Sequence, residues 1–372
     1  DVLAEVRVAP EPITSCSMSE TELAIINLHV VSRSMPELPF QLEDASRTEE
    51  RGEGADDLGD DDEEEEKGAE SAGGAGGDGA APRVKRKIRL NNRWIDLRTP
   101  ANQGIMRIQA GVIGLFREFL SARGFTEIMT PKLLAGASEG GAEVFHLKYF
   151  GQDACLAQSP QLYKQMVAVG SDFGRVFEIG PVFRAENSFT HKHLTEFHGL
   201  DMEMTFKEHY YEVLEVFSDL FAFIFEELSK RYASEIEAVR AQYPFEDFKF
   251  CKPALKLTYE EGISLLQAAG CEPDNKKDLG SAEEKLLGRI VKEKYGTDFF
   301  MMDRYPKEAR PFYSMPCPDD EGLTNSYDFF MRGEEILSGA QRVHEPELLA
   351  KQAAEKGVPP ESIKPYIDSF RY

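Results

Sequence analysis

The sequence predicts an α+β fold, in which a mixed and mainly antiparallel sheet is flanked by helices. Strand-like and helix-like segments do not alternate regularly along the chain, as they do in proteins built around a parallel sheet. Two strand-like segments, 326–331 and 334–343, are separated only by Arg332-Gly333, which suits a tight turn between antiparallel strands. With 372 residues and a hydrophobic content of 41%, the chain is long and apolar enough to bury at least one large core.

The first 43 residues predict a small β segment. β-branched residues with partial alternation occupy 20–32, and the first residues also read as a strand. About forty residues are too few to close a β-barrel. We therefore expect residues 1–43 to be the C-terminal part of a larger β domain, and we interpret the chain, which starts with Asp1, as a fragment.

Residues 44–88 predict an acidic, Gly/Ala-rich linker. The stretch 49–78 holds 14 acidic and 2 basic residues, about half of the net charge of −23. It has almost no aromatic or β-branched residues, so 47–82 cannot bury enough apolar surface to offset the entropy of ordering, and we expect disorder there. The net charge therefore does not exclude an RNA partner. The basic residues at 83–89 are expected to contact either an RNA backbone or the acidic linker.

The rest of the chain carries the main helices and strands. Thr99-Pro100 starts a helix that runs to about Arg123 with apolar residues on one face, and Gly124 ends it. A strand follows at 125–129, before Pro131. Further elements are expected in this order: a helix from Ser159, strands at 175–186 and 196–206, a helix at 210–231, a strand at 255–259, helices at 260–269 and 282–295, and strands at 298–303, 326–331 and 334–343.

Several classes of function are disfavoured by what the sequence lacks. Five scattered cysteines without a Cys-x-x-Cys pair argue for a reducing compartment and against a structural zinc site. No apolar run approaches the roughly 20 residues of a membrane span, and no signal peptide is visible. We expect a cytoplasmic protein that does not contact membranes. The sequence has no Walker loop, no Rossmann fingerprint and no His-Glu-x-x-His, so any nucleotide must be bound in another way.

One segment suggests how a nucleotide is bound. Phe183-Arg184-Ala185-Glu186 ends a strand-like run, and a polar loop leads to a second run at 196–203. An arginine on a strand grips a phosphate through its planar fork, and Phe197 is placed across the hairpin to stack on a purine. The alternative for Arg184 is a structural ion pair with Glu186 or Glu178.

These residues resemble motif 2 of the class II aminoacyl-tRNA synthetases. The wider string at 177–188 is similar to aspartyl-tRNA synthetases of the eukaryotic and archaeal type, which belong to class IIb. The segments 138–142, 158–165 and 330–342 support this resemblance. It implies a class II catalytic domain over 89–372, and it makes 1–43 similar to the end of an anticodon-binding OB-fold.

The resemblance implies roles for the residues that bind ATP. Arg184 is the catalytic residue and binds the α-phosphate, Glu186 lies at the adenine or at the tRNA acceptor end, and Phe197 stacks on adenine. His193 lies in a loop that reaches the distal phosphates and the acceptor end. Glu335 and Ser338 hold the Mg²⁺ that accompanies ATP, as hard oxygen ligands do. A lone Glu-x-x-Ser outside this family indicates only polar surface.

The amino acid is predicted from two cations. A pocket that presents Lys164 and Arg342 suits a side-chain carboxylate, whereas an amide leaves both charges unpaired. Aspartate is therefore favoured over asparagine; the alternative is that Lys164 is an exposed helix lysine. The resemblance implies further contacts. Those with aspartate come from Gln161, Asp201, Ser338 and a lid over 138–142 that contains Glu139. Those with the tRNA come from Ser188, Phe189 and Thr190.

The function implied is that of an aspartate–tRNA ligase. L-aspartate and ATP form aspartyl-adenylate, which is then transferred to the 3′ end of tRNA(Asp). The segment 125–131 is similar to motif 1 of the family, which implies a homodimer. The family continues beyond Tyr372 into a third motif, whose arginine holds the γ-phosphate, so we expect this chain to be impaired in activating aspartate. The alternatives are an asparaginyl- or lysyl-tRNA synthetase, or a non-catalytic scaffold with a synthetase fold.

Overall fold

The computed structural model describes residues 1–372 except 15, 17, 49–82, 136–143 and 188–191. The chain divides into two compact units, which are described separately. The first contains Asp1–Arg47 and Gly76–Thr99, and the second contains Thr48–Ala75 and Pro100–Tyr372. Several predictions concern residues outside this description. They are the disorder at 47–82, of which only 47 and 48 are described, the lid residue Glu139, and the tRNA contacts Ser188, Phe189 and Thr190.

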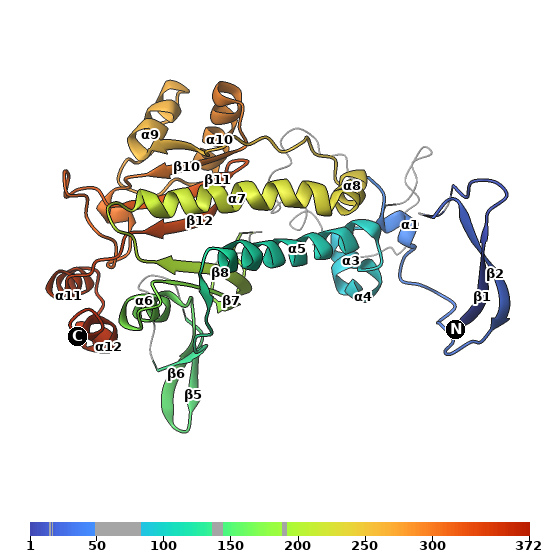
Figure 1. The fold of residues 1–372 in the computed structure, drawn as a ribbon, viewed down its shortest axis with the longest axis horizontal. Helices are drawn as coiled ribbons and strands as arrows, with labels where there is room; N and C mark the ends of the chain where they lie inside the picture. Colours follow the sequence, from blue (N-terminus) through green and yellow to red (C-terminus); the bar gives the residue numbers. More distant parts are fainter. Residues whose placement is uncertain (15, 17, 49–82, 136–143, 188–191) are drawn as a thin grey trace, which may run out of the picture. The chain divides into compact units, whose positions relative to one another are not determined.

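Among the residues that the structure describes, the first unit contains a hairpin and three short helices (Figure 1). Strands β1 (Val2–Val8) and β2 (Thr21–Leu28) pair antiparallel, and apolar side chains of the pair such as Val6 and Ile25 are exposed. Two strands alone cannot bury such residues. The helices are α1 (Leu42–Ala45), α3 (Arg86–Asn91) and α4 (Arg93–Asp96). The expected linker is therefore helical at both of its ends.

A buried ion pair joins α3 to α4. Arg89 donates to Asp96 at 2.7 Å, and both side chains are almost inaccessible to solvent. Arg93 donates to the second oxygen of the same carboxylate at 2.6 Å. Two of the basic residues after the linker thus pair with an acid inside the first unit, which neither expectation for this segment had included.

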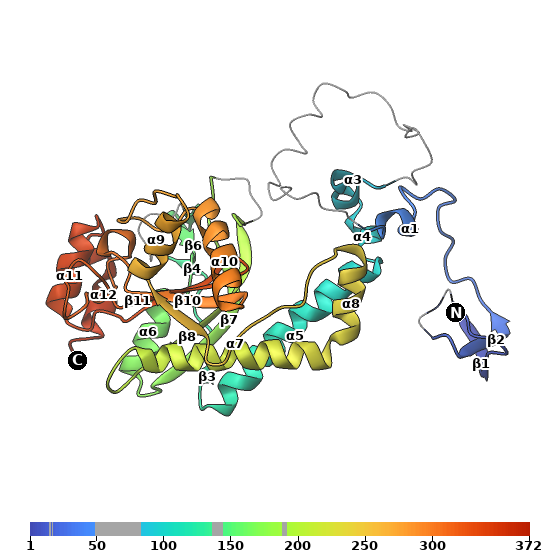
Figure 2. The ribbon, with the colours of Figure 1, turned by 90° about the horizontal axis from the view of Figure 1, so that it is seen from above.

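Three helices provide one layer of the second unit. They are α5 (Pro100–Ala122), α7 (Tyr211–Arg231) and α8 (Ala233–Gln242). The predictions of α5 and α7 are confirmed, whereas α8 was not predicted. Helices α5 and α7 lie side by side in both views (Figures 1 and 2). Because α5 is apolar along one face, it packs closely on its neighbours.

The described strands of this unit form three sheets. One has the order β3 (Thr126–Glu127), β7 (Arg175–Phe183), β8 (Glu196–Met204). A second has the order β12 (Glu334–Ala340), β11 (Ser326–Met331), β10 (Phe299–Asp303), β9 (Leu255–Thr258). The third has the order β4 (Leu133–Leu134), β6 (Gln152–Leu156), β5 (His146–Tyr149). Only β3–β7 and β9–β10 are parallel among these described pairs, so the mainly antiparallel, mixed fold is confirmed.

The remaining described helices lie against the sheets and at the C-terminal end. They are α6 (Gln161–Gly170), α9 (Tyr259–Ala268), α10 (Ser281–Tyr295), α11 (Pro346–Glu355) and α12 (Lys364–Asp368), with the short turns η2 (Lys307–Ala309) and η3 (Pro360–Ile363). Helix α6 lies on β7 and β8, α9 on β9 and β10, and α10 on β12. Helix α9 begins with a capping box, in which Thr258 and Glu261 bond to each other's backbone N–H. Helix α10 is followed by Gly296 in the left-handed conformation, the usual C-terminal signal.

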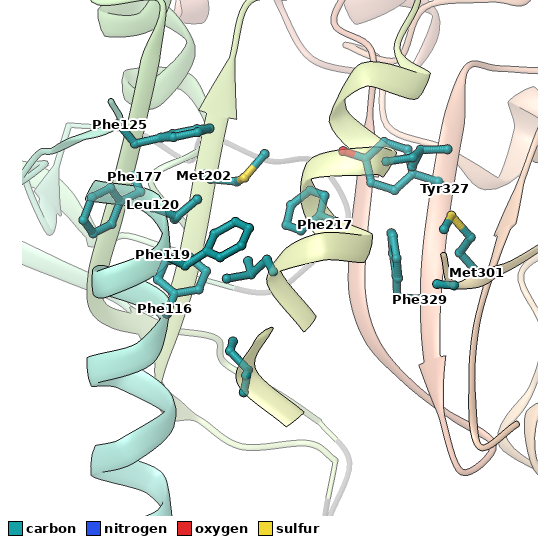
Figure 3. Packing of buried hydrophobic residues seen from close by; sticks show 14 of the residues in the cluster. Phe116, Phe119, Leu120, Phe125, Phe177, Met202, Phe217, Met301, Tyr327 and Phe329 are labelled. Carbon is teal, nitrogen blue, oxygen red and sulfur yellow. The ribbon is translucent and has the colours of Figure 1, made fainter. Parts of the chain in front are cut away.

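The main hydrophobic core joins α5, α7 and the strands of two sheets (Figure 3). Phe116, Phe119 and Leu120 of α5 meet Phe177 and Met202 of β7 and β8. Phe217 of α7 continues the core toward Tyr327 and Phe329 of β11. Burial of large aromatic rings stabilises the fold by about 1.5–3 kcal/mol for each side chain. This core fixes the strands that carry the candidate site.

Candidate active site

A cavity of about 1620 Å³ in the second unit brings the predicted site residues together. Side chains from α6, β8 and β12 and the residue after β7 line its polar part, and apolar residues of α5 and α7 line the rest. All ten predicted site residues that the structure describes line this cavity: Gln161, Lys164, Arg184, Glu186, His193, Phe197, Asp201, Glu335, Ser338 and Arg342. Residues separated by up to 181 positions in the sequence therefore share one site.

Arg184 follows β7 and does not lie within it. The predicted strand extended to 186, but β7 ends at Phe183 because only the Arg184 N–H continues the pairing, donating to the Thr195 carbonyl at 3.0 Å. The guanidinium carbon lies 5.3 Å from the ring centroid of Phe197, in cation–π range. Its Nε atom is buried and has no hydrogen-bond partner in the described part of the chain.

The alternative ion pair of Arg184 with Glu178 is not formed. Glu178 instead accepts from Lys132 at 2.7 Å and from the Thr130 hydroxyl at 2.7 Å. Among the described residues Arg184 makes no ion pair, and its guanidinium borders the cavity beside an aromatic ring. This is a suitable environment for a ligand that carries both a phosphate and a planar base.

Two cations and two carboxylates alternate at one side of the cavity. Lys164 donates to Asp201 at 2.8 Å and lies 3.8 Å from Glu203. Arg342 grips Glu203 with two hydrogen bonds, of 3.0 and 3.1 Å. We call Lys164, Asp201, Glu203 and Arg342 the charge quartet. Lys164 is buried, so the interpretation of an exposed helix lysine is wrong.

The charge quartet changes the argument about the amino acid. The sequence interpretation treated Lys164 and Arg342 as two unpaired cations, whereas each already has a carboxylate partner. A neutral quartet with charges of both signs suits a ligand that itself carries an ammonium and carboxylates. Glu203 had no predicted role. Its position two residues after Asp201 on β8 puts both acids on one face, a signal that the sequence contained.

Acidic residues gather around Arg310 at the β11–β12 side of the cavity. Asp328 and Ser338 are cross-strand partners, and Arg310 donates to both of them. Glu335 lines the cavity with an exposed side chain, and partial desolvation by the surrounding protein raises the pKa of its carboxyl above the usual range. The Asp328 carboxylate raises that pKa further, and Arg310 opposes the rise.

The donor set of this corner fits Mg²⁺. This ion accepts hard oxygen ligands, such as the carboxylates of Glu335 and Asp328 and the hydroxyl of Ser338. A metal cation, in addition to Arg310, would reduce the repulsion between the Glu335 and Asp328 carboxylates. Among the described residues, no group of three or more His, Cys, Asp or Glu side chains could hold a metal ion by itself. An open site is typical of Mg²⁺, which keeps several waters and shares its coordination with substrate phosphates.

The loop between β7 and β8 is tied to α10. Lys192 donates to the buried Glu284 at 2.6 Å, and the same carboxylate oxygen accepts the N–H of Glu335 at 3.3 Å. Glu284 therefore links the loop to the strand that carries the acidic corner. Neither Glu284 nor Arg310 had a predicted role, because ion pairs between distant segments leave no local pattern.

No helix in the described part of the chain is long and apolar enough to cross a membrane.

Comparison with known proteins agrees with this geometry. The profile for the tRNA synthetases class II (D, K and N) matches residues 85–372. Over all 372 residues the chain is 50% identical to the cytoplasmic aspartate–tRNA ligase of Mus musculus, and it spans 69% of that protein. It is 50% identical over 363 residues to aspartate–tRNA ligase 1, cytoplasmic, of Arabidopsis thaliana, 97% of the chain and 64% of that protein.

Solved structures show the same relationship. The aspartyl-tRNA synthetase of Entamoeba histolytica superimposes with a TM-score of 0.83 and 43% identity, covering all of this chain and 70% of that one. The asparaginyl-tRNA synthetase of Pyrococcus horikoshii with asparaginyl-adenylate is more distant, with a TM-score of 0.68 and 31% identity over 78% of this chain and 65% of that one. The chain belongs to the class II tRNA synthetases of the D, K and N group.

Proposed function

We propose that this protein is an aspartate–tRNA ligase, which activates L-aspartate with ATP and transfers it to tRNA(Asp). The observation that carries the proposal is the charge quartet beside Arg184 and Phe197. The relatives named above, which are 50% identical to this chain over the aligned residues, are aspartate–tRNA ligases. The named asparaginyl-tRNA synthetase is a weaker match, which favours aspartate over the asparagine alternative.

Aspartate fits the charge quartet by its own charges. Its side-chain carboxylate approaches Lys164 and Arg342, and its α-ammonium approaches Asp201, with Gln161 at the same wall. The amide of asparagine brings no charge, so the cations gain less from it. The Gln161 amide nitrogen is buried without a hydrogen-bond partner in the described part of the chain, and it is available to the substrate. We propose Glu139 as a further contact, from the lid.

ATP binds along the other wall of the cavity. Phe197 stacks on adenine, Glu186 lies at the adenine or the acceptor end, and His193 lies toward the distal phosphates. Arg184 binds the α-phosphate and stabilises the charge that develops there when the aspartate α-carboxylate attacks and pyrophosphate leaves. Glu335 and Ser338, with Asp328 beside them, would hold Mg²⁺, which neutralises phosphate charge. The chemistry needs no protein nucleophile, since positioning lowers the barrier.

In the second step the 3′-hydroxyl of the terminal adenosine of tRNA(Asp) attacks the acyl carbon of aspartyl-adenylate, an ester forms, and AMP leaves. We propose that Ser188, Phe189 and Thr190 contact the acceptor end, because they precede Lys192 and His193, which line the cavity. We also propose a cytoplasmic location, as the names of the relatives give for those proteins.

We propose that two copies form a dimer through the segment 125–131. Met129 lies in this segment with 93% of its surface exposed, and a partner surface would remove it from water. Sedimentation of the complete gene product tests this proposal. We expect a dimer, and we expect Met129→Glu to shift it toward monomer, whereas a monomeric parent protein would contradict the proposal.

The decisive experiment is ATP–pyrophosphate exchange by the complete gene product with aspartate, asparagine or lysine. Only aspartate should support exchange, and only tRNA(Asp) should then be charged. Exchange with asparagine or lysine would reassign the amino acid. Failure of all three amino acids in a folded protein would favour the non-catalytic scaffold.

A further inference from the structure

Arg310 is a buried cation among carboxylates, and the activity described above assigns it no role. It lies after η2, in the loop that leads to β11, and its side chain is 6% exposed. Its Nη1 and Nη2 atoms hold the two Asp328 oxygens at 3.0 and 2.5 Å. Nη1 also donates to the Ser338 hydroxyl at 3.1 Å. One guanidinium thus fixes a carboxylate on β11 and a hydroxyl on β12.

Two more contacts hold the guanidinium itself in place. Its carbon lies 3.8 Å from the ring centroid of Tyr305, and Nη2 lies 3.5 Å from Asp278. The Tyr305 ring is buried, so it provides a rigid platform. An arginine that is held on its face and along its edge has little freedom to leave. The groups that it binds are therefore held equally firmly.

Arg310 fixes two residues of the proposed Mg²⁺ site. Ser338 is one of the proposed ligands, and Asp328 lies beside it. Asp328 faces Ser338 across the strands, and Glu335 lies on the same strand as Ser338. Without a cation between them, the acids at this corner would repel one another and separate. The planar fork of arginine orients a carboxylate by two parallel bonds, which lysine cannot do.

We propose that Arg310 is a positioning residue, which holds Asp328 and Ser338 so that, together with Glu335, they bind the Mg²⁺ that accompanies ATP. The proposal rests on the proposed function, because that function supplies the metal and the nucleotide. Arg310 acts through Asp328 and Ser338 and does not touch the reacting atoms. It determines the affinity for the metal and leaves the affinity for aspartate unchanged, since the charge quartet does not include it.

The test uses the Arg310→Lys variant of the complete gene product, because lysine keeps the buried charge and loses the fork. Binding of Mn²⁺ is measured by titration calorimetry in the presence of a non-hydrolysable ATP analogue. We expect the Kd for Mn²⁺ to rise at least tenfold, the Mg²⁺ requirement of pyrophosphate exchange to rise in parallel, and the KM for aspartate to change less than twofold.

The matched control is Arg304→Lys. Arg304 pairs with Asp319 at 2.8 Å, on the same segment but with a partner that is 61% exposed, and it does not line the cavity. This control should leave the Kd for Mn²⁺ unchanged. An Arg310→Lys protein that binds Mn²⁺ as tightly as the parent, or more tightly, would overturn the proposal. A parallel loss of aspartate affinity would overturn it as well, because the role would then be a general one in folding.

If the Arg310→Lys protein does not fold, a second variant tests the proposal. Tyr305→Leu removes the platform under the guanidinium and leaves the polar atoms of Arg310, Asp328 and Ser338 in place, and we expect the Kd for Mn²⁺ to rise about threefold. An unchanged Kd in this folded variant contradicts the proposal. Failure of the proposed function is distinguishable, because it abolishes aspartate-dependent exchange by the parent protein and leaves the comparison of Mn²⁺ binding intact.

Discussion

At the scale of single residues, the charge quartet is the feature that most constrains the chemistry. Lys164 and Arg342 come from distant segments of the sequence, and β8 supplies an acid to each of them. Removing one member leaves its partner charged in a largely buried place, which costs more than the pair contributed. The effect of a substitution here should therefore appear in substrate binding and also in the position of the remaining charges.

Lys164→Ala tests the predicted contact with the substrate carboxylate. We expect the KM for aspartate in pyrophosphate exchange to rise by about 100-fold or more, corresponding to about 2.7 kcal/mol, because a charged partner is lost from a buried site. The control is Lys148→Ala, since Lys148 is 70% exposed on the β5–β6 hairpin. Unchanged kinetics of the Lys164 variant would remove the basis for choosing aspartate.

Phe197→Ala tests the stacking of adenine. The ring lies beside Arg184 in the cavity, and loss of a stacked aromatic costs about 1–3 kcal/mol for each base. We expect the KM for ATP to rise about tenfold, whereas the KM for aspartate should change little. Phe150, which is 90% exposed at a hairpin tip, provides the matched Phe→Ala control. A larger effect on aspartate than on ATP would contradict the assignment.

At the scale of elements, close packing of backbone determines where α10 lies on the second sheet. The turn between β11 and β12 contacts this helix directly, and a Cβ atom at Gly288 would stand 2.5 Å from the Gly333 Cα. Gly333 also has a φ of +75°, which favours glycine. Two glycines thus allow α10 to approach the strand that carries Glu335.

Gly288→Ala should therefore destabilise the protein by about 1–3 kcal/mol, since the added methyl group has no space. Gly114→Ala is the control, and its expected effect on stability has the opposite sign. Gly114 is exposed within α5, and a Cβ atom there meets nothing within 4 Å among the described residues. This control should stabilise the helix by about 0.5–1 kcal/mol. Urea unfolding measures both changes, and equal signs for the two would contradict the packing argument.

At the scale of the whole molecule, the fold separates the cysteines into accessible and inaccessible thiols. Cys155 and Cys317 are buried, whereas Cys16 and Cys251 are exposed. Burial also raises the pKa of the Cys317 thiol to about 11, so very little thiolate is present near neutral pH.

Alkylation with iodoacetamide at pH 8, followed by mass spectrometry, should label Cys16 and Cys251 within minutes. Cys155 and Cys317 should react only after denaturation, because the native fold both covers and protonates them. The same sample in guanidinium, where all five cysteines react, is the control. Rapid labelling of Cys317 in the native protein would show that this part of the core opens easily.

Long periodic elements were predictable, whereas short ones were not. Helices α5 and α7 and strands β7 and β8 lie where apolar periodicity predicted them. The small sheet β4–β6–β5 was missed because its strands have two to five residues and many exposed side chains. Its hairpin turns at Phe150-Gly151 with positive φ at both residues, and phenylalanine is not a residue that signals such a turn.

The sequence by itself determined the fold class and the β7–β8 hairpin through local periodicity, and its resemblance to the class II synthetases supplied ten of the residues that line the cavity. Only the tertiary structure decided how the charges pair. Glu203 with Arg342, Glu284 with Lys192 and Arg310 with Asp328 are partners from distant segments. Pairing of this kind depends on the distance between folded elements and on their desolvation, and neither quantity exists before the chain has folded.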